Sequence, residues 1–370
     1  MKIVCKACGH QAHDLKPHFI GGRDGGCSVT EKEYLERFPG AELVSELFKR
    51  KLSEMRSSKS LNNTLTVKQY SIHKTFGIAM GKDAMIDGFV ERSPNVPDID
   101  PEYQFPLEAT KIILVGLTTN RPTMVHGPTG SGKSTLIEQI AARINYPVLR
   151  VNHHKDMYSY DIVGQKKIEG GETKFEYGPA PIAMRQPMIL IMDEWDATNP
   201  EVALLYQSLL ERRHDGSRLG NLVLTANSGE RIEAHPRFRI VATSNTTGLG
   251  DEKGYYQGTE VQNIAFISRF LLRVKLDYMD IKQETELLRK KFPALSADEA
   301  AAFAKTASLI RKRFEAGELN VPYSIRDLIN WADLYLMIGD AAQAMRFSCT
   351  SILPYSDEKV ISEIVQRTFS

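Results

Sequence analysis

The residues best suited to chemistry form one glycine-rich segment about a third of the way along the chain. The segment fits the pattern G-x-x-x-x-G-K-[ST] in full, as Gly127-Pro128-Thr129-Gly130-Ser131-Gly132-Lys133-Ser134-Thr135. Glycines let the backbone N–H groups of such a loop turn toward phosphate, the lysine reaches the β- and γ-phosphates, and the hydroxyl after it can hold Mg²⁺. We therefore expect the whole segment to bind ATP, with Lys133 on the phosphates and Ser134 on Mg²⁺.

Two acidic residues end a continuous apolar run. Met188-Ile189-Leu190-Ile191-Met192 leads directly into Asp193 and Glu194. Ligands of open α/β folds bind at the carboxyl edge of the sheet, so we expect both carboxylates beside the phosphates. Asp193 would hold Mg²⁺ through its water shell, and Glu194 would polarise the attacking water. The alternative interpretation, a strand that ends in a helix cap, is disfavoured by the phosphate loop upstream.

Three further polar residues are expected near this edge from their order in the chain. Asn245 follows the apolar strand that starts at Arg239, and it would orient the lytic water beside Glu194 without carrying a charge. Arg269 precedes another strand and is a candidate arginine finger for the nucleotide of a neighbouring subunit; an ordinary surface ion pair is the alternative. Arg326 opens a later helix, and because helix N-termini favour anions, nearby phosphates would explain it better than solvent.

Three of the four cysteines, Cys5, Cys8 and Cys27, lie within the first thirty residues. The Cys5-x-x-Cys8 spacing suits one side of a tetrahedral Zn²⁺ site, and later His and Cys residues can close the other side. His18 is the expected third ligand, with His13 as the alternative, and Cys27 is the fourth. We expect a structural zinc module, because so short a block otherwise lacks a core. Reduced cysteines without a metal are the alternative.

These residues require an alternation of strands and helices between Thr66 and Leu276, and the sequence shows one. Such an alternation is what a parallel sheet with right-handed crossovers needs. The expected strands are Thr123–His126, Val148–Asn152, Met188–Asp193, Arg239–Ser244 and Phe270–Lys275. The continuous apolar runs at Met188 and Arg239 fit central strands that are covered on both faces. The predicted fold class is α/β, with a five-stranded parallel sheet between helices.

The chain divides into four parts. Residues 1–44 form the cysteine-containing block, and the polar, basic residues 45–65 have the composition of a linker. Residues 66–276 form the α/β core, in which Lys166–Tyr177 is expected to be a hairpin that turns at Gly170-Gly171. Residues 277–370 are helical and form a lid, with a capping box at Ser296-x-x-Glu299 and a second helical pattern from about Ser324.

Length and composition are those of an ordinary globular protein. The chain has 370 residues, of which 42% are hydrophobic and 25% charged, with a formal net charge of +1. This balance gives no global argument for affinity to nucleic acid or to a membrane. The apolar runs are too short to span a bilayer, and the N-terminus lacks the apolar core of a signal peptide. We expect a cytoplasmic protein without a membrane partner.

In this order, the motifs resemble the MoxR branch of the AAA+ ATPases, and within it the CobS-type ATPase subunits of aerobic cobaltochelatase. The resemblance covers about Ser71 to Phe292. Beyond the phosphate loop it rests on Phe76-Gly77-Ile78, Val96–Phe105, Ile137–Arg143, Arg150-Val151-Asn152, Asp161–Gly164, Asp193–Ala197 and Gly248–Thr259. It implies Mg²⁺-dependent ATP hydrolysis, a hexameric ring with nucleotide between subunits, an insert near Gln165–Tyr177 that projects toward the pore, and a lid of three or four helices.

Two segments depart from that family. His153-His154-Lys155-Asp156 is a basic variant of its stretch; the paired histidines invite a metal site, but adjacent residues of a strand point to opposite faces and seldom share an ion. The N-terminal block more loosely resembles Ros/MucR-like and phage-type zinc fingers. An added zinc module suggests a divergent, phage-encoded relative that would act in the cytoplasm of the host.

Three functions are compatible with these observations. The first is a ring ATPase that couples hydrolysis to remodelling of a protein partner, for which the resemblance implies a chelatase subunit or a protein with a von Willebrand A domain. The second is a nucleic-acid-associated motor or regulator, docked through the zinc module and the basic stretch Lys49–Lys59; a finger of this kind binds DNA weakly and with strong salt dependence. The third is a nucleotide-dependent scaffold with little turnover.

Overall fold

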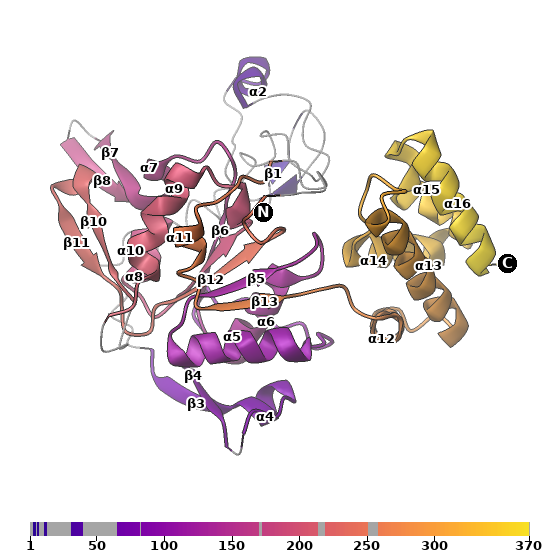
Figure 1. Ribbon diagram of the computed structural model, residues 1–370, viewed down its shortest axis with the longest axis horizontal. Helices are drawn as coiled ribbons and strands as arrows, with labels where there is room; N and C mark the ends of the chain where they lie inside the picture. The colour runs from indigo at the N-terminus through magenta and orange to yellow at the C-terminus, as the bar shows by residue number, and fades with distance from the viewer. Residues whose placement is uncertain are drawn as a thin grey trace.

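Figure 1 shows the computed structural model of the chain, which describes residues 3–4, 6, 11–12, 31–39, 65–81, 83–169, 172–213, 219–250 and 258–369. Its central element is a parallel sheet of five strands: β5 (Thr123–His126), β6 (Val148–Asn152), β9 (Ile189–Asp193), β12 (Arg239–Ser244) and β13 (Leu272–Lys275). The order across the sheet is β13-β5-β12-β9-β6, with every pair parallel. The predicted α/β class and the five-stranded sheet are confirmed; β9 and β13 start one and two residues later than expected.

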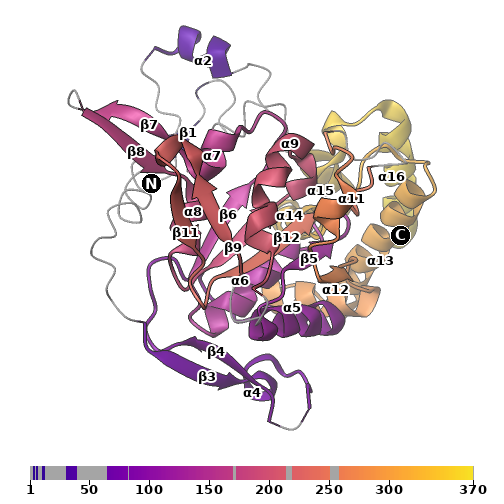
Figure 2. The ribbon, with the colours of Figure 1, turned by 60° about the vertical axis from the view of Figure 1, so that its left-hand side comes forward.

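The apolar sequence of β9 follows from its burial on both faces. Ile189 and Ile191 pack into the core on one side of the sheet, and Leu190 and Met192 pack into the core on the other. Adjacent residues of a strand point to opposite faces, so a doubly covered strand needs an apolar residue at each position. The covering helices are α5 (Leu107–Thr119) and α6 (Lys133–Arg143) on the first side and α8 (Pro179–Met184) and α10 (Gln207–Leu210) on the second (Figure 1). Figure 2 shows α5, α6 and α8 from another direction.

Three of the four antiparallel strand pairs among the described residues lie in the same part of the chain as the sheet. β7 (Gly164–Glu169) and β8 (Glu172–Tyr177) pair as expected for the hairpin, and its expected turn residues, Gly170 and Gly171, lie outside the described residues. The pairs β10 (Asn221–Leu224) with β11 (Glu230–Glu233) and β3 (Val67–Ser71) with β4 (Met85–Phe89) were not predicted, because no motif or continuous apolar run marks these short segments. Short helices complete the core: α4 (Ile72–Phe76), α7 (Ser159–Val163), α9 (Pro200–Ala203), α11 (Ile264–Ile267) and a 3₁₀ turn at Trp195–Ala197.

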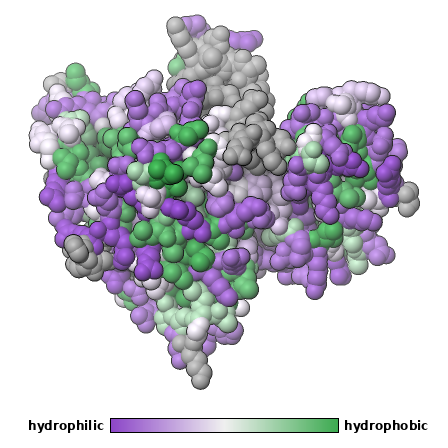
Figure 3. All heavy atoms as spheres, viewed as in Figure 1, coloured by the Kyte–Doolittle hydropathy of each residue, from purple (hydrophilic) through white to green (hydrophobic). Residues whose placement is uncertain are grey.

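The C-terminal part is a helical lid with its own core. It contains α12 (Ile281–Lys291), α13 (Ala297–Glu315), α14 (Ile325–Ile338), α15 (Ala341–Ser348) and α16 (Tyr355–Phe369), five helices where the resemblance implies three or four. Phe303, Trp331 and Phe369 meet at its centre, with ring centroids 4.3, 4.9 and 5.5 Å apart. The expected capping box of Ser296 and Glu299 begins α13, and Ser324 caps α14. Figures 1 and 3 show the lid as a lobe beside the core. No described helix, in the lid or elsewhere, is long and apolar enough to cross a membrane.

Only parts of the N-terminal block are described. β1 (Ile3–Val4) and β2 (Gln11–Ala12) form a short antiparallel pair, and α2 (Glu31–Arg37) carries the buried Tyr34. Several positions that the sequence singled out lie outside the described residues: Cys5, Cys8, His13, His18, Cys27 and residues 45–64 of the expected linker. The zinc module therefore stays a prediction.

Candidate functional site

The phosphate loop joins the end of β5 to the start of α6 at the carboxyl edge of the sheet. Gly130 and Gly132 have φ angles of +69° and +89°, and the loop needs glycine there because L side chains rarely adopt this conformation. Ser131 is buried, and its Oγ atom has no hydrogen-bond partner among the described residues. The buried Lys133 donates from Nζ to two carbonyl oxygens at the start of the loop, each at 2.9 Å.

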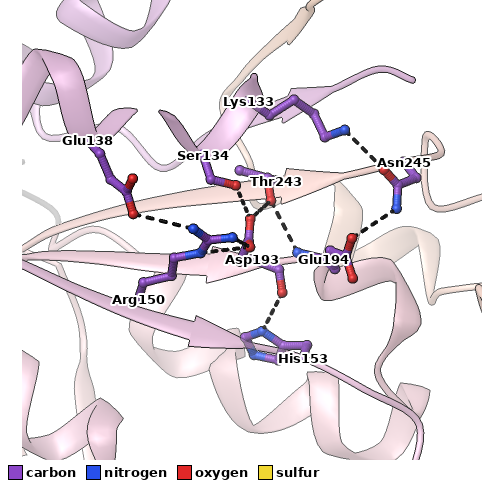
Figure 4. Close-up of polar contacts among 9 residues, drawn as sticks. All are labelled: Lys133, Ser134, Glu138, Arg150, His153, Asp193, Glu194, Thr243 and Asn245. Atoms are coloured by element: carbon purple, nitrogen blue, oxygen red, sulfur yellow. Dashed lines mark hydrogen bonds and ion pairs between the residues drawn. The ribbon is translucent and has the colours of Figure 1, made fainter. Parts of the chain in front are cut away.

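Asp193 ends β9 and gathers donors from three other elements (Figure 4). Its carboxylate is buried and accepts hydrogen bonds from the hydroxyls of Ser134 and Thr243 and from the guanidinium of Arg150, whose Nε lies 2.8 Å from Oδ2. Nη1 of Arg150 also lies 3.4 Å from Oε1 of Glu138. Burial alone would raise the pKa of Asp193, but the Arg150 charge and the hydroxyl hydrogen bonds outweigh it and hold the pKa below its ordinary value.

Glu194 follows with an unusual backbone conformation. Its φ of +53° lies in the left-handed region, which costs a non-glycine residue of order 1–3 kcal/mol, and its N–H donates to Oγ1 of Thr243 at 3.1 Å. Nδ2 of Asn245 lies 3.5 Å from Oε1 of Glu194, and Oδ1 of Asn245 accepts from Nζ of Lys133 at 3.0 Å. The structure thus brings Glu194 and Asn245 together and joins both to the phosphate loop.

A second buried carboxylate, Asp196, holds the backbone around Asn245. Its Oδ2 accepts from the N–H of Asn245 at 3.1 Å, and from the N–H and the hydroxyl of Thr246 at 2.9 Å each. Burial raises the pKa of Asp196, although the hydrogen bonds from Thr246 and Asn245 oppose the rise. Because hydrogen bonds to a carboxylate are among the stronger ones, Asp196 fixes the point from which the Asn245 side chain projects.

His153 uses both ring nitrogens within the fold. Nδ1 lies 3.1 Å from the backbone carbonyl oxygen of Asp193 and therefore carries the proton, while Nε2 lies 3.0 Å from the hydroxyl of Tyr206. Burial lowers the pKa of His153 to about 4, so the ring is neutral at neutral pH. The hydrogen bond of His153 thus holds the backbone at the end of β9. The adjacent His154 is half-buried.

The aromatic residue between the acids links this edge to α11. Trp195 is fully buried and packs against Phe266 and Phe270, with ring centroids 5.3 and 5.6 Å away. Arg269 lies in the same turn of chain; it donates to a backbone carbonyl of α11 at 2.7 Å and pairs with Glu211 at 3.1 Å. Within one chain, Arg269 makes the surface ion pair that was the alternative to an arginine finger.

The lid approaches the phosphate loop through the start of α14. A Cβ atom built on Gly130 would lie 2.3 Å from the Cβ of Ser324, the N-cap residue of this helix. Arg326 is exposed in the first turn, two residues farther on. The structure therefore brings the helix start that carries Arg326 against the loop.

The chemistry of the site fits a nucleoside triphosphate and Mg²⁺. The left-handed glycines and the hydroxyl of Ser131 place donors at the sheet edge, beside the charge of Lys133. The Ser134 hydroxyl and the Asp193 carboxylate are in hydrogen-bond contact, and both offer the oxygen ligands that Mg²⁺ prefers. These two residues would hold the ion.

Three residues of this site were not predicted: Arg150, Thr243 and Asp196. Each contacts Asp193 or Asn245 across a long sequence separation, which no local pattern reveals. One signal was present, because Thr243 follows three apolar residues of a strand that is expected to be buried, and a buried hydroxyl requires a partner.

Comparison with known proteins gives two family matches. An AAA domain (dynein-related subfamily) matches residues 122–270, and the CbbQ/NirQ/NorQ C-terminal region matches residues 284–370. Aerobic cobaltochelatase subunit CobS of a Sinorhizobium species is 35% identical over 307 residues, 81% of this chain and 90% of CobS. NorQ of Paracoccus denitrificans is 27% identical over 190 residues, 51% of this chain and 64% of NorQ. The denitrification regulatory protein NirQ of Stutzerimonas stutzeri is 26% identical over 208 residues, 56% of this chain and 70% of NirQ.

The contacts of Asp196 generate a first prediction. Asp196→Asn removes the charge that holds the backbone N–H groups of Asn245 and Thr246, so Asn245 loses its placement beside Glu194. A misplacement of about 1 Å costs roughly 10²-fold in rate. We expect ATP turnover to fall by about that factor in a phosphate-release assay, while nucleotide affinity persists. Asp98→Asn, at an exposed carboxylate, is the matched control; equal turnover in both variants would contradict the role given to Asp196.

Proposed function

The chain belongs to the MoxR/CobS/NorQ family of AAA+ ATPases, and we propose that it forms a Mg²⁺-dependent ring motor that couples ATP hydrolysis to remodelling of a protein partner. One observation carries the proposal: Lys133, Ser134, Asp193, Glu194 and Asn245 meet at one edge of the sheet. Phosphate binding alone would need only the loop. The Glu194 and Asn245 pair adds groups that activate and orient water, which favours a motor over a scaffold.

Each residue of the site is proposed to have a separate task. Lys133 exchanges its backbone carbonyl partners for the terminal phosphates, and its charge offsets theirs. Ser134 and Asp193 hold Mg²⁺, which when bound neutralises charge on the phosphate oxygens. Glu194 accepts the proton of the attacking water, and the Asn245 amide orients that water by hydrogen bonding.

A ring would give Arg269 a task that a single chain does not. Its ion pair with Glu211 is partly exposed, and such pairs contribute only about 0–1 kcal/mol. The guanidinium can therefore exchange Glu211 for a phosphate on a neighbouring subunit at little cost. An arginine supplied in trans contributes roughly 10³–10⁵ in rate where such fingers are known. The proposed ring is a hexamer, in which residues 66–276 carry out the chemistry and residues 277–370 close over the nucleotide through Arg326.

The partner is proposed from the resemblance and from an exposed hairpin. CobS is, by its name, a subunit of aerobic cobaltochelatase, so a chelatase-type subunit or a protein with a von Willebrand A domain is the proposed client. The β7–β8 hairpin would contact it: Ile168 is 81% exposed near the turn, beside the exposed Lys167. The resemblance implies that this insert projects toward the pore of the ring, which is where a client would meet it.

Glu194→Gln distinguishes a motor from a scaffold. The amide cannot accept the proton of the water, so turnover should fall by about 10²–10⁴-fold while ATP still binds. Lys133→Ala should instead lose nucleotide affinity, because the charge that meets the phosphates is gone. Phosphate release and equilibrium binding of a fluorescent nucleotide measure the two effects, with Glu102→Gln as a surface control. A wild-type chain that hydrolyses ATP no faster than Glu194→Gln would refute the motor.

Arg269→Ala tests the ring. Mixed with wild-type chains, each variant subunit should disable the site of its neighbour, so the ATPase rate of a half-and-half mixture should lie well below half. Arg313→Ala, which removes an exposed lid arginine paired with Glu318, is the control and should leave the rate of a mixture unchanged. Strictly proportional loss with Arg269→Ala would argue against a finger that acts in trans.

The zinc module is testable on the full chain. Metal analysis after purification should find about one Zn²⁺ per chain, held by Cys5, Cys8, Cys27 and His18 or His13. Cys5→Ser with Cys8→Ser should abolish the bound zinc, whereas Cys349→Ser in the lid should not. Zinc retained by the double variant would exclude these residues as ligands.

A further inference from the structure

The chain that leaves the core for the lid runs directly beside the phosphate loop. The N–H of Leu276 donates to the carbonyl of His126 at 2.8 Å, and a Cβ atom on Gly127 would lie 2.1 Å from the carbonyl oxygen of Leu276. Two residues farther on, the hydroxyl of Tyr278 donates to the backbone carbonyl of Thr129 at 2.7 Å. The core-to-lid connection is therefore in contact with both the start and the middle of the loop.

The Tyr278 hydrogen bond fixes the direction of a loop amide. The Thr129–Gly130 peptide is trans, as is every described peptide bond, so its C=O and N–H groups point in opposite directions. A hydroxyl that holds the Thr129 carbonyl therefore turns the Gly130 N–H to the far side. Glycine visits both signs of φ readily, so a peptide next to Gly130 has little intrinsic reason to keep one orientation. An external hydrogen bond supplies that reason.

A second contact on the same peptide comes from the lid itself. Gly130 packs so closely on Ser324 that even a methyl group would overlap its Cβ atom. Ser324 is the N-cap of α14, and its hydroxyl and N–H are tied to Asp327. The loop peptide is thus in contact with both Tyr278 and the start of α14.

One buried side chain, Arg311 of α13, contacts both Tyr278 and the residue before Ser324. Its guanidinium carbon lies 4.1 Å from the centre of the Tyr278 ring, and its Nε donates to the carbonyl of Tyr323 at 2.8 Å, directly before Ser324. Nη1 pairs with the fully buried Glu284 of α12 at 2.6 Å. A pair that served only to join α12 and α13 would not need the ring face and the Tyr323 carbonyl as well. Buried ion pairs seldom stabilise a fold more than apolar residues do, which favours a positional role.

We propose that Tyr278 and Arg311 form a brace through which the lid sets the orientation of the Thr129–Gly130 peptide, and with it the affinity of the loop for nucleotide phosphates. Tyr278 and Arg311 are positioning residues, since neither is placed to touch the reacting atoms. The brace rests on the proposed function in one respect, that the loop holds the phosphates of ATP. A movement of the lid should then change the affinity for phosphates, and phosphate binding should shift the position of the lid by the same coupling free energy.

Tyr278→Phe in the full chain tests the brace with the least disturbance. The ring stays under Arg311, and only the hydroxyl that meets Thr129 is lost. Removing one hydrogen bond of this kind should weaken binding of mant-labelled ADP by about 2- to 12-fold. The KM for ATP should rise more than kcat changes, because the loop amide contributes to binding of substrate and transition state alike. The thermal unfolding midpoint without nucleotide should fall by no more than a few degrees, since one hydrogen bond is lost.

Tyr335→Phe is the matched control. It removes another half-buried lid hydroxyl, which bonds Glu299 at 2.6 Å, and it should leave nucleotide affinity unchanged. Equal ADP affinity in wild-type and Tyr278→Phe chains would overturn the brace. A wild-type chain that bound no nucleotide would instead overturn the proposed function, so the two failures are distinguishable.

The part played by Arg311 needs a paired variant, because Glu284 must not be left buried and alone. Arg311→Met with Glu284→Leu replaces the ion pair by apolar residues of similar size, which buried pairs commonly tolerate. This variant should bind ADP more weakly, and adding Tyr278→Phe to it should have less effect than in the wild-type chain. Fully additive losses would show that Arg311 does not act through Tyr278.

Discussion

A carboxylate buried at a sheet edge stays charged only if its neighbours satisfy it, and the geometry of this site depends on how Asp193 is satisfied. Its two oxygens offer about four lone-pair positions. Ser134 and Thr243 donate to Oδ1, and two nitrogens of Arg150 donate to Oδ2. These donors come from α6, β12 and β6, so one carboxylate fixes the phosphate-loop helix and the strands on both sides of β9.

The three residues that follow β9 each have a different task. The left-handed turn at Glu194 changes the direction of the chain, so that Trp195 enters the core while Asp196 reaches the backbone of Asn245. The burial of Trp195 against Phe266 and Phe270 offsets the backbone strain at Glu194. The same ring contacts fix the position of the turn that carries Arg269. The water-activating edge and the proposed intersubunit arginine therefore share one packed cluster. A change in either can be transmitted to the other through rigid aromatic contacts.

The elements with a local cause could be predicted from the sequence. The phosphate loop needs glycine where φ is positive, the central strands need continuous apolar runs, and helices such as α13 need capping residues at fixed spacing. Arg150, Asp196 and Tyr278 could not be predicted, because each acts on a residue that is 43, 49 or 149 positions away. Their types are also uninformative: an arginine, an aspartate and a tyrosine outside any repeated pattern are most often surface or packing residues.

The same saturation of Asp193 explains why an arginine, and not a lysine, suits position 150. Every lone pair of the carboxylate is taken by a protein donor, so a cation that binds there must displace one of them. The hydroxyls of Ser134 and Thr243 sit on short side chains fixed by α6 and β12, whereas the Arg150 side chain is long and 40% exposed on an edge strand. Glu138 lies 3.4 Å from its Nη1, so the guanidinium has a second carboxylate within reach. The planar guanidinium can donate to two carboxylates at once and can move its hydrogen bonds from one to the other, which a single ammonium group does poorly. Arg150 thus keeps Asp193 ionised, and among the three donor side chains it is the longest and the one with a second carboxylate within reach.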